Sequence, residues 1–227
     1  PARQAAVGAG IGWDVHAVAV NKVCLSGLTA IIDAARMLRV GDATVVVAAG
    51  MESMTQAPHL LMGSRAGWQY GSIEALDSMA YDGLTDAYDR ESMGASTERY
   101  NERFGISREA QDAVAARSHQ RAAAAQAAGI FDAEIVAVDV PQRRGESIRV
   151  TADEGIRPET TTETLATLRP AFAEGGTLTA GNSSQISDGA SAVVLTTRSH
   201  ADEQGWPVLA VVGASGQVAG PDNSLHA

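Results

Sequence analysis

The residue with the clearest chemistry is Cys24, the only cysteine in the chain. It lies in Val-Asn-Lys-Val-Cys-Leu-Ser-Gly, between an apolar run at residues 15–20 and a segment whose apolar residues recur at a helical period. This order predicts a turn from a strand into a helix, where free N–H groups favour a thiolate over a thiol. Because a thiolate accepts acyl groups readily, we interpret Cys24 as a nucleophile for acyl transfer rather than as a buried structural cysteine.

The segments around Cys24 predict the elements that must position it. We expect a helix over residues 3–9, a strand over 15–20, a helix over 26–39 with a left-handed cap at Gly41, and a strand over 43–49. The last of these is a continuous apolar run, which suits a strand buried on both faces of a parallel sheet. The two strands and the helix between them therefore predict a βαβ unit.

Beyond residue 54 the pattern becomes polar and is interrupted by glycines, which favours an inserted subdomain over a simple connection. Within it we expect a helix over 107–128, with Ser107 as its N-cap and Gly129 as its end. We also expect a strand pair over 134–140 and 147–150, and loops near residues 158–162 and 170. A strand over 190–197 is predicted to rejoin the first sheet, followed by a helix over 199–204 and a strand over 207–213.

The composition narrows the class of protein. A net charge of −10 argues against a general nucleic-acid or membrane-surface binder, and there is no apolar run of about 18 residues that predicts a membrane span. The first residues do not resemble a signal peptide, and a single cysteine, which forms no internal disulfide, suits a reducing compartment. We therefore expect a cytoplasmic protein. The histidines show no metal-ligand spacing, and we predict no metal.

Three blocks, in order, resemble the thiolase family: Asn-Lys-Val-Cys-x-Ser-Gly around Cys24, Ala-Ala-Gly-Met-Glu-Ser-Met at 48–54, and Leu-Thr-Ala-Gly-Asn-Ser-Ser-Gln-Ile-Ser-Asp-Gly-Ala at 178–190. The resemblance covers essentially the whole chain. It implies a layered αβαβα fold of the α/β class, with only the first half present, so that the chain is an internal fragment. It also implies an N-terminal core at 1–54, a loop domain that binds coenzyme A at 55–184, a return strand and helix at 185–206, and the start of a C-terminal domain at 207–227. The missing half would leave a large apolar face exposed.

The resemblance also implies the reaction. Thiolases transfer an acyl group between thioesters by a ping-pong mechanism, and Cys24 matches their acyl-carrying cysteine. In the family a histidine and a second cysteine from the C-terminal half move protons, and this chain contains no match to either, so the isolated chain is expected to be inactive. Coenzyme A and acyl-CoA are expected as substrates, with no permanently bound cofactor.

Six residues match family positions that contact coenzyme A or the acyl group. They are Arg157 at the nucleotide end, Thr164 facing the coenzyme, Ala180, Ser184 and Leu84 along the pantetheine arm, and Met93 beside the reactive sulfur. The chain departs from some short-chain enzymes at one position, because Ser92 stands where they have histidine.

Several functions stay open at this point. An acetyl-CoA C-acetyltransferase is favoured, which condenses two acetyl-CoA molecules to acetoacetyl-CoA or cleaves 3-ketoacyl-CoA with CoA. A longer-chain 3-ketoacyl-CoA thiolase of β-oxidation would use the same residues, whereas ketoacyl synthases usually lack the second block and the long loop domain. A non-catalytic protein that binds acyl-CoA or lipid, or a simple oligomerisation unit, is the alternative of a different class. The full-length protein is expected to act in fatty-acid and lipid metabolism as a homodimer or homotetramer, with acyl-CoA substrates and no nucleic-acid or membrane partner.

Overall fold

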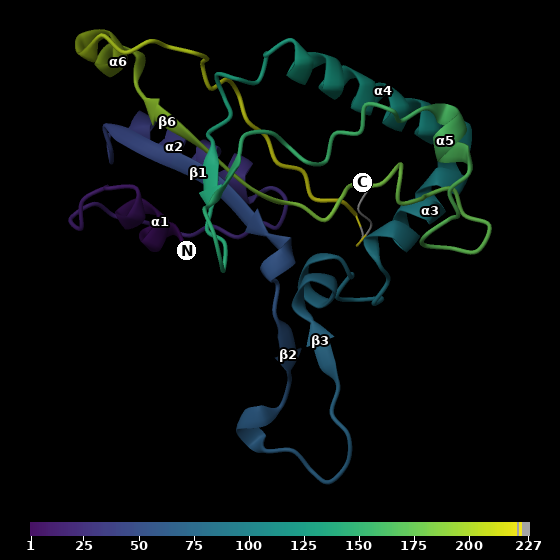
Figure 1. Cartoon of the computed structure of the whole chain (residues 1–227). Coiled ribbons are helices and arrows are strands. Elements are labelled where there is room, and N and C mark those ends of the chain that lie inside the picture. Colours follow the sequence, from purple (N-terminus) through teal and green to yellow (C-terminus); the bar gives the residue numbers. More distant parts are fainter. Residues whose placement is uncertain (222, 224–227) are drawn as a thin grey trace. The chain divides into compact units, whose positions relative to one another are not determined.

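Helices and strands are mixed along the chain in the computed structural model, which describes residues 1–221 and 223 (Figure 1). The predicted α/β class is confirmed. The helices are α1 Ala2–Gly8, α2 Ser26–Val40, α3 Met93–Phe104, α4 Arg108–Ala127, α5 Thr162–Ala166 and α6 Arg198–Gln204, with shorter helical turns η1 Met54–Gln56, η2 Ser64–Ala66 and η3 Met79–Gly83. The strands are β1 Val45–Ser53, β2 His59–Leu61, β3 Ala75–Asp77, β4 Val138–Val140, β5 Ile148–Val150 and β6 Asp188–Thr196.

The chain divides into two compact units, each described here by itself. The first unit contains Pro1–Ala57 and Asp188–Val218, and the second contains Pro58–Ser187 with residues 219–221 and 223. The sequence had placed a loop domain at residues 55–184 between two parts of a core. That this stretch binds coenzyme A stays a prediction. Residue 222 and residues 224–227 of the expected C-terminal segment lie outside the described residues.

The first unit is built on one antiparallel strand pair covered by a helix. Strand β1 pairs with β6 over nine residues, from Val45 opposite Thr196 to Ser53 opposite Asp188. Side chains of α2 pack on one face of this pair and form a small core from Ala34, Leu38, Ala48 and Leu195. Helix α2 ends as predicted, with Gly41 in the left-handed region at φ 80°.

The opposite face of this strand pair is apolar and exposed. Val45, Val47 and Met51 of β1 and Val194 of β6 expose 40–65% of their surface. They share one face, because residues two apart in a strand point the same way and Val47 lies opposite Val194. The sequence predicted such an exposed apolar face, and what packs on it stays a prediction.

Four expectations about the first unit were wrong. Residues 15–20 and 207–213 form no strand, and β1 is paired antiparallel rather than in a parallel βαβ unit. The expectation that β1 is buried on both faces fails with them, because α2 covers one face only. Both apolar segments run without a paired neighbour among the described residues, and a strand forms only where an adjacent backbone supplies its hydrogen bonds.

The second unit combines two small hairpins with three helices. Strand β2 pairs with β3, and β4 with β5, both antiparallel; the β2–β3 hairpin is the blue extension in Figure 1. The β4–β5 pair confirms the predicted pairing, although β4 is shorter than expected. Helix α4 confirms the predicted alanine-rich helix, since Ser107 Oγ accepts the Ala110 N–H at 3.2 Å and Gly129 adopts a positive φ of 69°.

Two short helices complete the account of the predicted elements. The loop expected at residues 158–162 runs directly into α5, and α6 and β6 lie close to their predicted positions. Over residues 1–221 and 223, none of the helices combines the length and apolar character that a membrane span requires.

Candidate functional site

Cys24 lies exposed in a tight turn directly before α2, in the first unit. The residue before it, Val23, has a φ of +49°, a conformation that a β-branched side chain rarely adopts. Hydrogen bonds hold this turn: Ser26 Oγ accepts the Lys22 N–H at 2.8 Å and donates to Val23 O at 2.7 Å. The Val23 N–H donates to Asn21 Oδ1 at 3.0 Å. Side chains on both sides of the cysteine therefore fix the strained backbone that presents it.

The start of α2 is seated directly on β1 through two glycines. A Cβ atom at Gly50 would lie 3.3 Å from Gly27 Cα, and one at Gly27 would lie 3.5 Å from Gly50 Cα. The helix backbone thus lies so close to the strand that a side chain at Gly50 would be crowded against Gly27. Gly27 follows Cys24 by three residues, so this contact sets the position of the cysteine turn relative to the sheet.

Leu84 and Met93, two of the predicted ligand contacts, lie together in the second unit. Leu84 ends η3 and its carbonyl accepts the Met93 N–H at 3.0 Å. Met93 is the first residue of α3, whose N-cap Ser92 accepts the Ala95 N–H at 3.2 Å. Ser92, noted in the sequence as a departure from some relatives, therefore has a helix-capping role here.

Arg157 is exposed, and its backbone is tied to α4. The Arg157 N–H donates to His119 Nδ1 at 3.2 Å, and Gln120 Nε2 donates to Thr160 O at 3.1 Å. Two neighbouring residues of α4 thus hold the loop that carries Arg157. The guanidinium is exposed, as contact with a phosphate group requires.

Thr164 lies in the first turn of α5, where it forms a capping box. The Thr164 N–H donates to Thr161 Oγ1 at 3.2 Å, and the Thr161 N–H donates to Thr164 Oγ1 at 3.0 Å. Thr164 Oγ1 also donates to Thr161 O at 2.9 Å. The hydroxyl is therefore engaged in starting this short helix while the residue stays exposed.

Ala180 and Ser184 lie in a loop that side chains of α3 and α4 hold by hydrogen bonds. Glu98 of α3 accepts the N–H groups of Thr177 and Leu178 at 2.7–2.9 Å and the Thr177 hydroxyl at 2.8 Å. Burial raises the pKa of Glu98, but the hydrogen bonds from Leu178 and Thr177 outweigh it, and the pKa lies below its ordinary value of 4.5. Glu98 is therefore held as a carboxylate under this loop.

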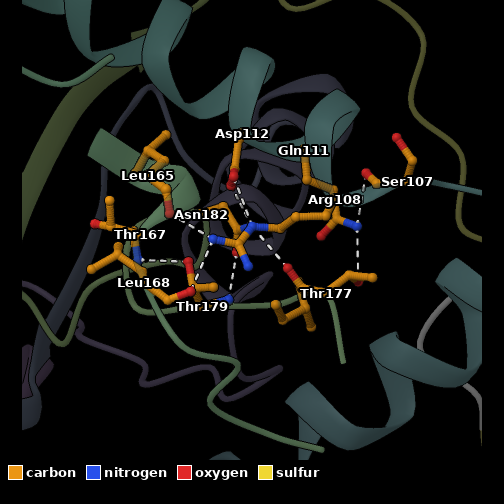
Figure 2. A network of polar contacts seen from close by, with 12 residues as sticks. Ser107, Arg108, Gln111, Asp112, Leu165, Thr167, Leu168, Thr177, Thr179 and Asn182 are labelled. Carbon is orange, nitrogen blue, oxygen red and sulfur yellow. Dashed lines mark hydrogen bonds and ion pairs between the residues drawn. The ribbon is translucent and has the colours of Figure 1, made fainter. Parts of the chain in front are cut away.

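A second set of polar contacts closes the loop, and Figure 2 shows it centred on Arg108. Asp112 of α4, which is 3% exposed, accepts Arg108 Nε at 2.7 Å and Asn182 Nδ2 at 2.9 Å. Asn182 Oδ1 accepts the N–H of Thr179, which is fully buried, at 2.7 Å. The Thr-Ala-Gly-Asn sequence is thus a turn locked by its own asparagine.

A hollow of about 620 Å³ lies between α3, α4 and residues 178–185. Ser184 and His119 line it. Gln111 Oε1 and Ser183 Oγ also belong to lining residues, and both atoms are buried with no hydrogen-bond partner among the described residues. The volume is that of a small-molecule site, and the two unsatisfied polar atoms are buried among the residues that line it.

The structure thus gathers the predicted contacts into two groups within the second unit. Leu84 and Met93 form one, and the loops carrying Arg157, Thr164, Ala180 and Ser184 around α4 form the other. Across residues 1–221 and 223, no three His, Cys, Asp or Glu side chains cluster as a metal site requires.

Sequence reasoning missed the residues beneath these loops. Nothing in the sequence marked Glu98, Asp112 or His119 as functional, and only the spacing of Arg108 and Asp112, four residues apart, gave a visible signal. Phe172 was also missed: its ring fills the space over Gly94, where a Cβ would lie 2.1 Å from it. No pattern in the sequence indicated that contact.

The matches to known proteins extend over both units. A family model described as "Thiolase, N-terminal domain" matches residues 1–199. The chain is 54% identical over 226 residues to a "Probable acetyl-CoA acetyltransferase" of Mycobacterium leprae, covering all of this chain and 58% of the relative. It is 49% identical over 212 residues to an "Acetyl-CoA acetyltransferase" of Chromobacterium violaceum (93% of this chain, 54% of the relative). It is 47% identical over 234 residues to a "Probable acetyl-CoA acyltransferase" of Staphylococcus epidermidis (100% and 59%). The chain therefore spans somewhat more than half the length of these relatives.

Proposed function

The chain belongs to the thiolase family, and from this we propose that the full-length protein is an acyl-CoA acyltransferase with Cys24 as its acyl carrier. The observation that carries the proposal is the cysteine turn. An exposed Cys24 follows a strained Val23 at the start of a helix, in a chain about half identical to proteins named acetyl-CoA acetyltransferase. A strained, exposed nucleophile at a helix start is an arrangement that suits attack on a thioester.

The proposed step is an exchange of thioesters. Cys24 Sγ attacks the carbonyl carbon of an acyl-CoA, the bond from that carbon to the CoA sulfur breaks, and CoA leaves as a thiol with the proton that Cys24 gives up. In the synthetic direction a second acetyl-CoA loses a proton from its methyl group, and the resulting carbon attacks the acyl-cysteine to form a 3-ketoacyl-CoA. The bond from the acyl carbon to Cys24 Sγ breaks in this step, and the cysteine takes up a proton and returns to its starting form. Splitting the transfer in two lowers the barrier of each part.

The second unit is proposed to hold the coenzyme. Arg157 supplies a positive charge for a phosphate or a flat surface for the adenine, Thr164 faces the coenzyme, and Ala180 and Ser184 face the pantetheine arm. Support comes from their common attachment to α4 and from the hollow that Ser184 lines. Leu84 is proposed to make an apolar contact with the pantetheine arm and Met93 to border the acyl group, and their direct backbone contact supports a shared role.

We favour acetyl as the acyl group, because the relatives from M. leprae and C. violaceum are named acetyl-CoA acetyltransferases. The S. epidermidis relative is named an acyltransferase, so a longer acyl chain is the alternative. Rates with acetoacetyl-CoA and with a long-chain 3-ketoacyl-CoA, both in the presence of CoA, decide between them. The acetyl assignment requires the shorter substrate to have the higher kcat/KM.

The test of the function itself is turnover by the full-length protein and by its Cys24→Ser variant. Cleavage of acetoacetyl-CoA by CoA is followed through loss of the substrate's absorbance. We expect wild-type turnover and a loss of at least about 1,000-fold in the variant, since a hydroxyl is a far weaker nucleophile than a thiolate. Similar rates for the two proteins refute Cys24 as the acyl carrier.

We also propose a cytoplasmic homodimer or homotetramer with a role in lipid metabolism. The β2–β3 hairpin region supports association, because Leu61, Met62, Trp68 and Ile73 each expose about half of their surface, and such apolar surface favours a protein partner. Light scattering of the full-length protein gives the oligomeric state. Cell fractionation gives the location.

A further inference from the structure

Two of the loops assigned to coenzyme A, those that carry Thr164 and Ala180, share one attachment, an ion pair on α4 in which Asp112 is buried and Arg108 is partly buried. Arg108 and Asp112 lie one helical turn apart, with Nε and Oδ2 2.7 Å apart, and the Asp112 side chain is 4% exposed. A buried carboxylate and a guanidinium are retained at an energetic cost unless they meet further partners. Each of these two side chains has such a partner on a different loop.

Asp112 controls the loop that carries Ala180. Its Oδ1 accepts Asn182 Nδ2 at 2.9 Å. A carboxylate only accepts hydrogen bonds, so it fixes Asn182 with its nitrogen toward α4 and its oxygen toward the Thr179 N–H, 2.7 Å away. Ala180 lies inside this closed turn.

Arg108 controls the segment that carries Thr164. Its Nη2 donates to Leu165 O at 2.6 Å and to Leu168 O at 3.1 Å, both at the end of α5. Figure 2 shows the guanidinium between these carbonyls and the Asp112 carboxylate. Leu165 O also accepts the Leu168 N–H at 3.0 Å, so the guanidinium adds a second donor to that carbonyl and ties this end of the segment to α4.

We propose that Arg108 and Asp112 are positioning residues for coenzyme A, which fix the Thr164 and Ala180 loops relative to each other through Asn182. The inference rests on the proposed function. Asp112 is too buried to reach a ligand itself, so its effect is on the geometry of the loops. Losing it leaves Asn182 free to turn, and the coenzyme must then order the loop on binding.

The test uses the full-length protein and the alkylation of Cys24 by iodoacetamide, followed on the Cys24 peptide by mass spectrometry. The concentration of CoA that gives half protection reports the dissociation constant for CoA, and the rate without CoA reports the cysteine turn alone. In Asp112→Ala we expect half protection at about tenfold more CoA, equivalent to about 1.4 kcal/mol. We expect an unchanged rate without CoA.

The matched control is Asp139→Ala. Asp139 also pairs with an arginine in the second unit, with Arg149 Nη1 3.2 Å from its Oδ2, but both side chains are exposed. Exposed pairs contribute little, so half protection is expected within about twofold of wild type. If the loss of a negative charge alone were responsible, Asp139→Ala would raise the CoA concentration for half protection as much as Asp112→Ala, and the inference would be overturned.

Asn182→Ala is a second, independent variant for the same assay. If Asp112→Ala does not fold, the result with Asn182→Ala alone tests the positioning role. It must also raise the CoA requirement about tenfold, and the double variant must cost less than the product of the two single effects, because both break the same contact. Wild-type protection by CoA with both single variants unchanged overturns the positioning role and leaves the proposed function standing. No protection by CoA in wild type overturns both.

Discussion

Glu98 offers the sharpest test of how the loop before Ala180 is held. Its carboxylate accepts from three donors: the Thr177 N–H, the Thr177 hydroxyl and the Leu178 N–H, all within 2.7–2.9 Å. Glu98→Ala removes every one of these acceptors and leaves the N–H of Leu178, a residue that is 9% exposed, without a partner. The loop should then open far more often than in wild type.

The size of the effect follows from the contacts. A hydrogen bond to a charged group contributes about 1.5–3 kcal/mol, and three that share one carboxylate are not additive. We therefore expect a loss of about 3 kcal/mol in the local free energy of opening, or about 100-fold faster amide exchange. Glu98→Gln keeps one acceptor oxygen and should lose about half of that free energy.

Hydrogen–deuterium exchange of the full-length protein, read on a peptide covering residues 174–180, measures this directly. Glu102→Ala is the control, because Glu102 lies one turn further along α3 and is exposed. Exchange in Glu98→Ala that matches Glu102→Ala would refute the account of the loop.

The protection of the same loop against amide exchange should decrease at acid pH. The pKa of Glu98 lies below 4.5 in the folded protein, so the carboxylate's contribution is complete above pH 4.5 and is lost as the pH falls through the folded pKa. Wild-type protection, corrected for intrinsic exchange, should decline in that range. Glu98→Gln should show no such decline.

Three further substitutions test other parts of the fold. Leu38→Ala, at a position 8% exposed in the core of the first unit, should cost about 2–5 kcal/mol and lower the melting temperature; a change within about 0.5 kcal/mol would contradict that core. Ser107→Ala removes the acceptor for the Ala110 N–H and should cost about 1 kcal/mol, with faster amide exchange confined to the first turn of α4. Gly50→Ala places a Cβ 3.3 Å from Gly27 Cα and should move the start of α2, which slows alkylation of Cys24 severalfold; an unchanged rate would show that the glycine contact does not position the cysteine.

Local signals in the sequence predicted α1, α2, α4 and α6, whereas α3 and α5 were not predicted. Ser107, Gly41 and Gly129 act within a turn of their own helix, so their effect needs no distant partner. The pairing of β4 with β5 was equally local, since only a short turn separates the two strands. These elements could be predicted because the residues that determine them are close in the chain.

The strand predictions that were wrong concern features that depend on residues far away in the sequence. The apolar runs at 15–20 and 207–213 have strand-like composition, but strand formation is decided by a neighbouring backbone, which composition does not reveal. The direction of the β1–β6 pairing was missed for the same reason, because its partners are separated by more than 130 residues. In these segments β-propensity indicated an apolar stretch but did not specify whether another strand pairs with it.

The residues of the candidate site show the same contrast between local and distant determinants. Cys24 could be proposed as the nucleophile because its turn, helix and family block are contiguous in the sequence. Glu98, Asp112 and His119 were not, because each acts on a loop 38 to 80 residues further along. Their chemistry became visible only when the fold placed α3 and α4 under those loops.

The most direct test of the account is to mix the full-length protein with acetyl-CoA, stop the reaction in acid, and locate the acetyl group by peptide mass spectrometry. We predict one acetyl group on Cys24, formed with release of one CoA and removed when free CoA is added back. An acetyl group on another residue, or full turnover with Cys24 never acetylated, would contradict the central claim.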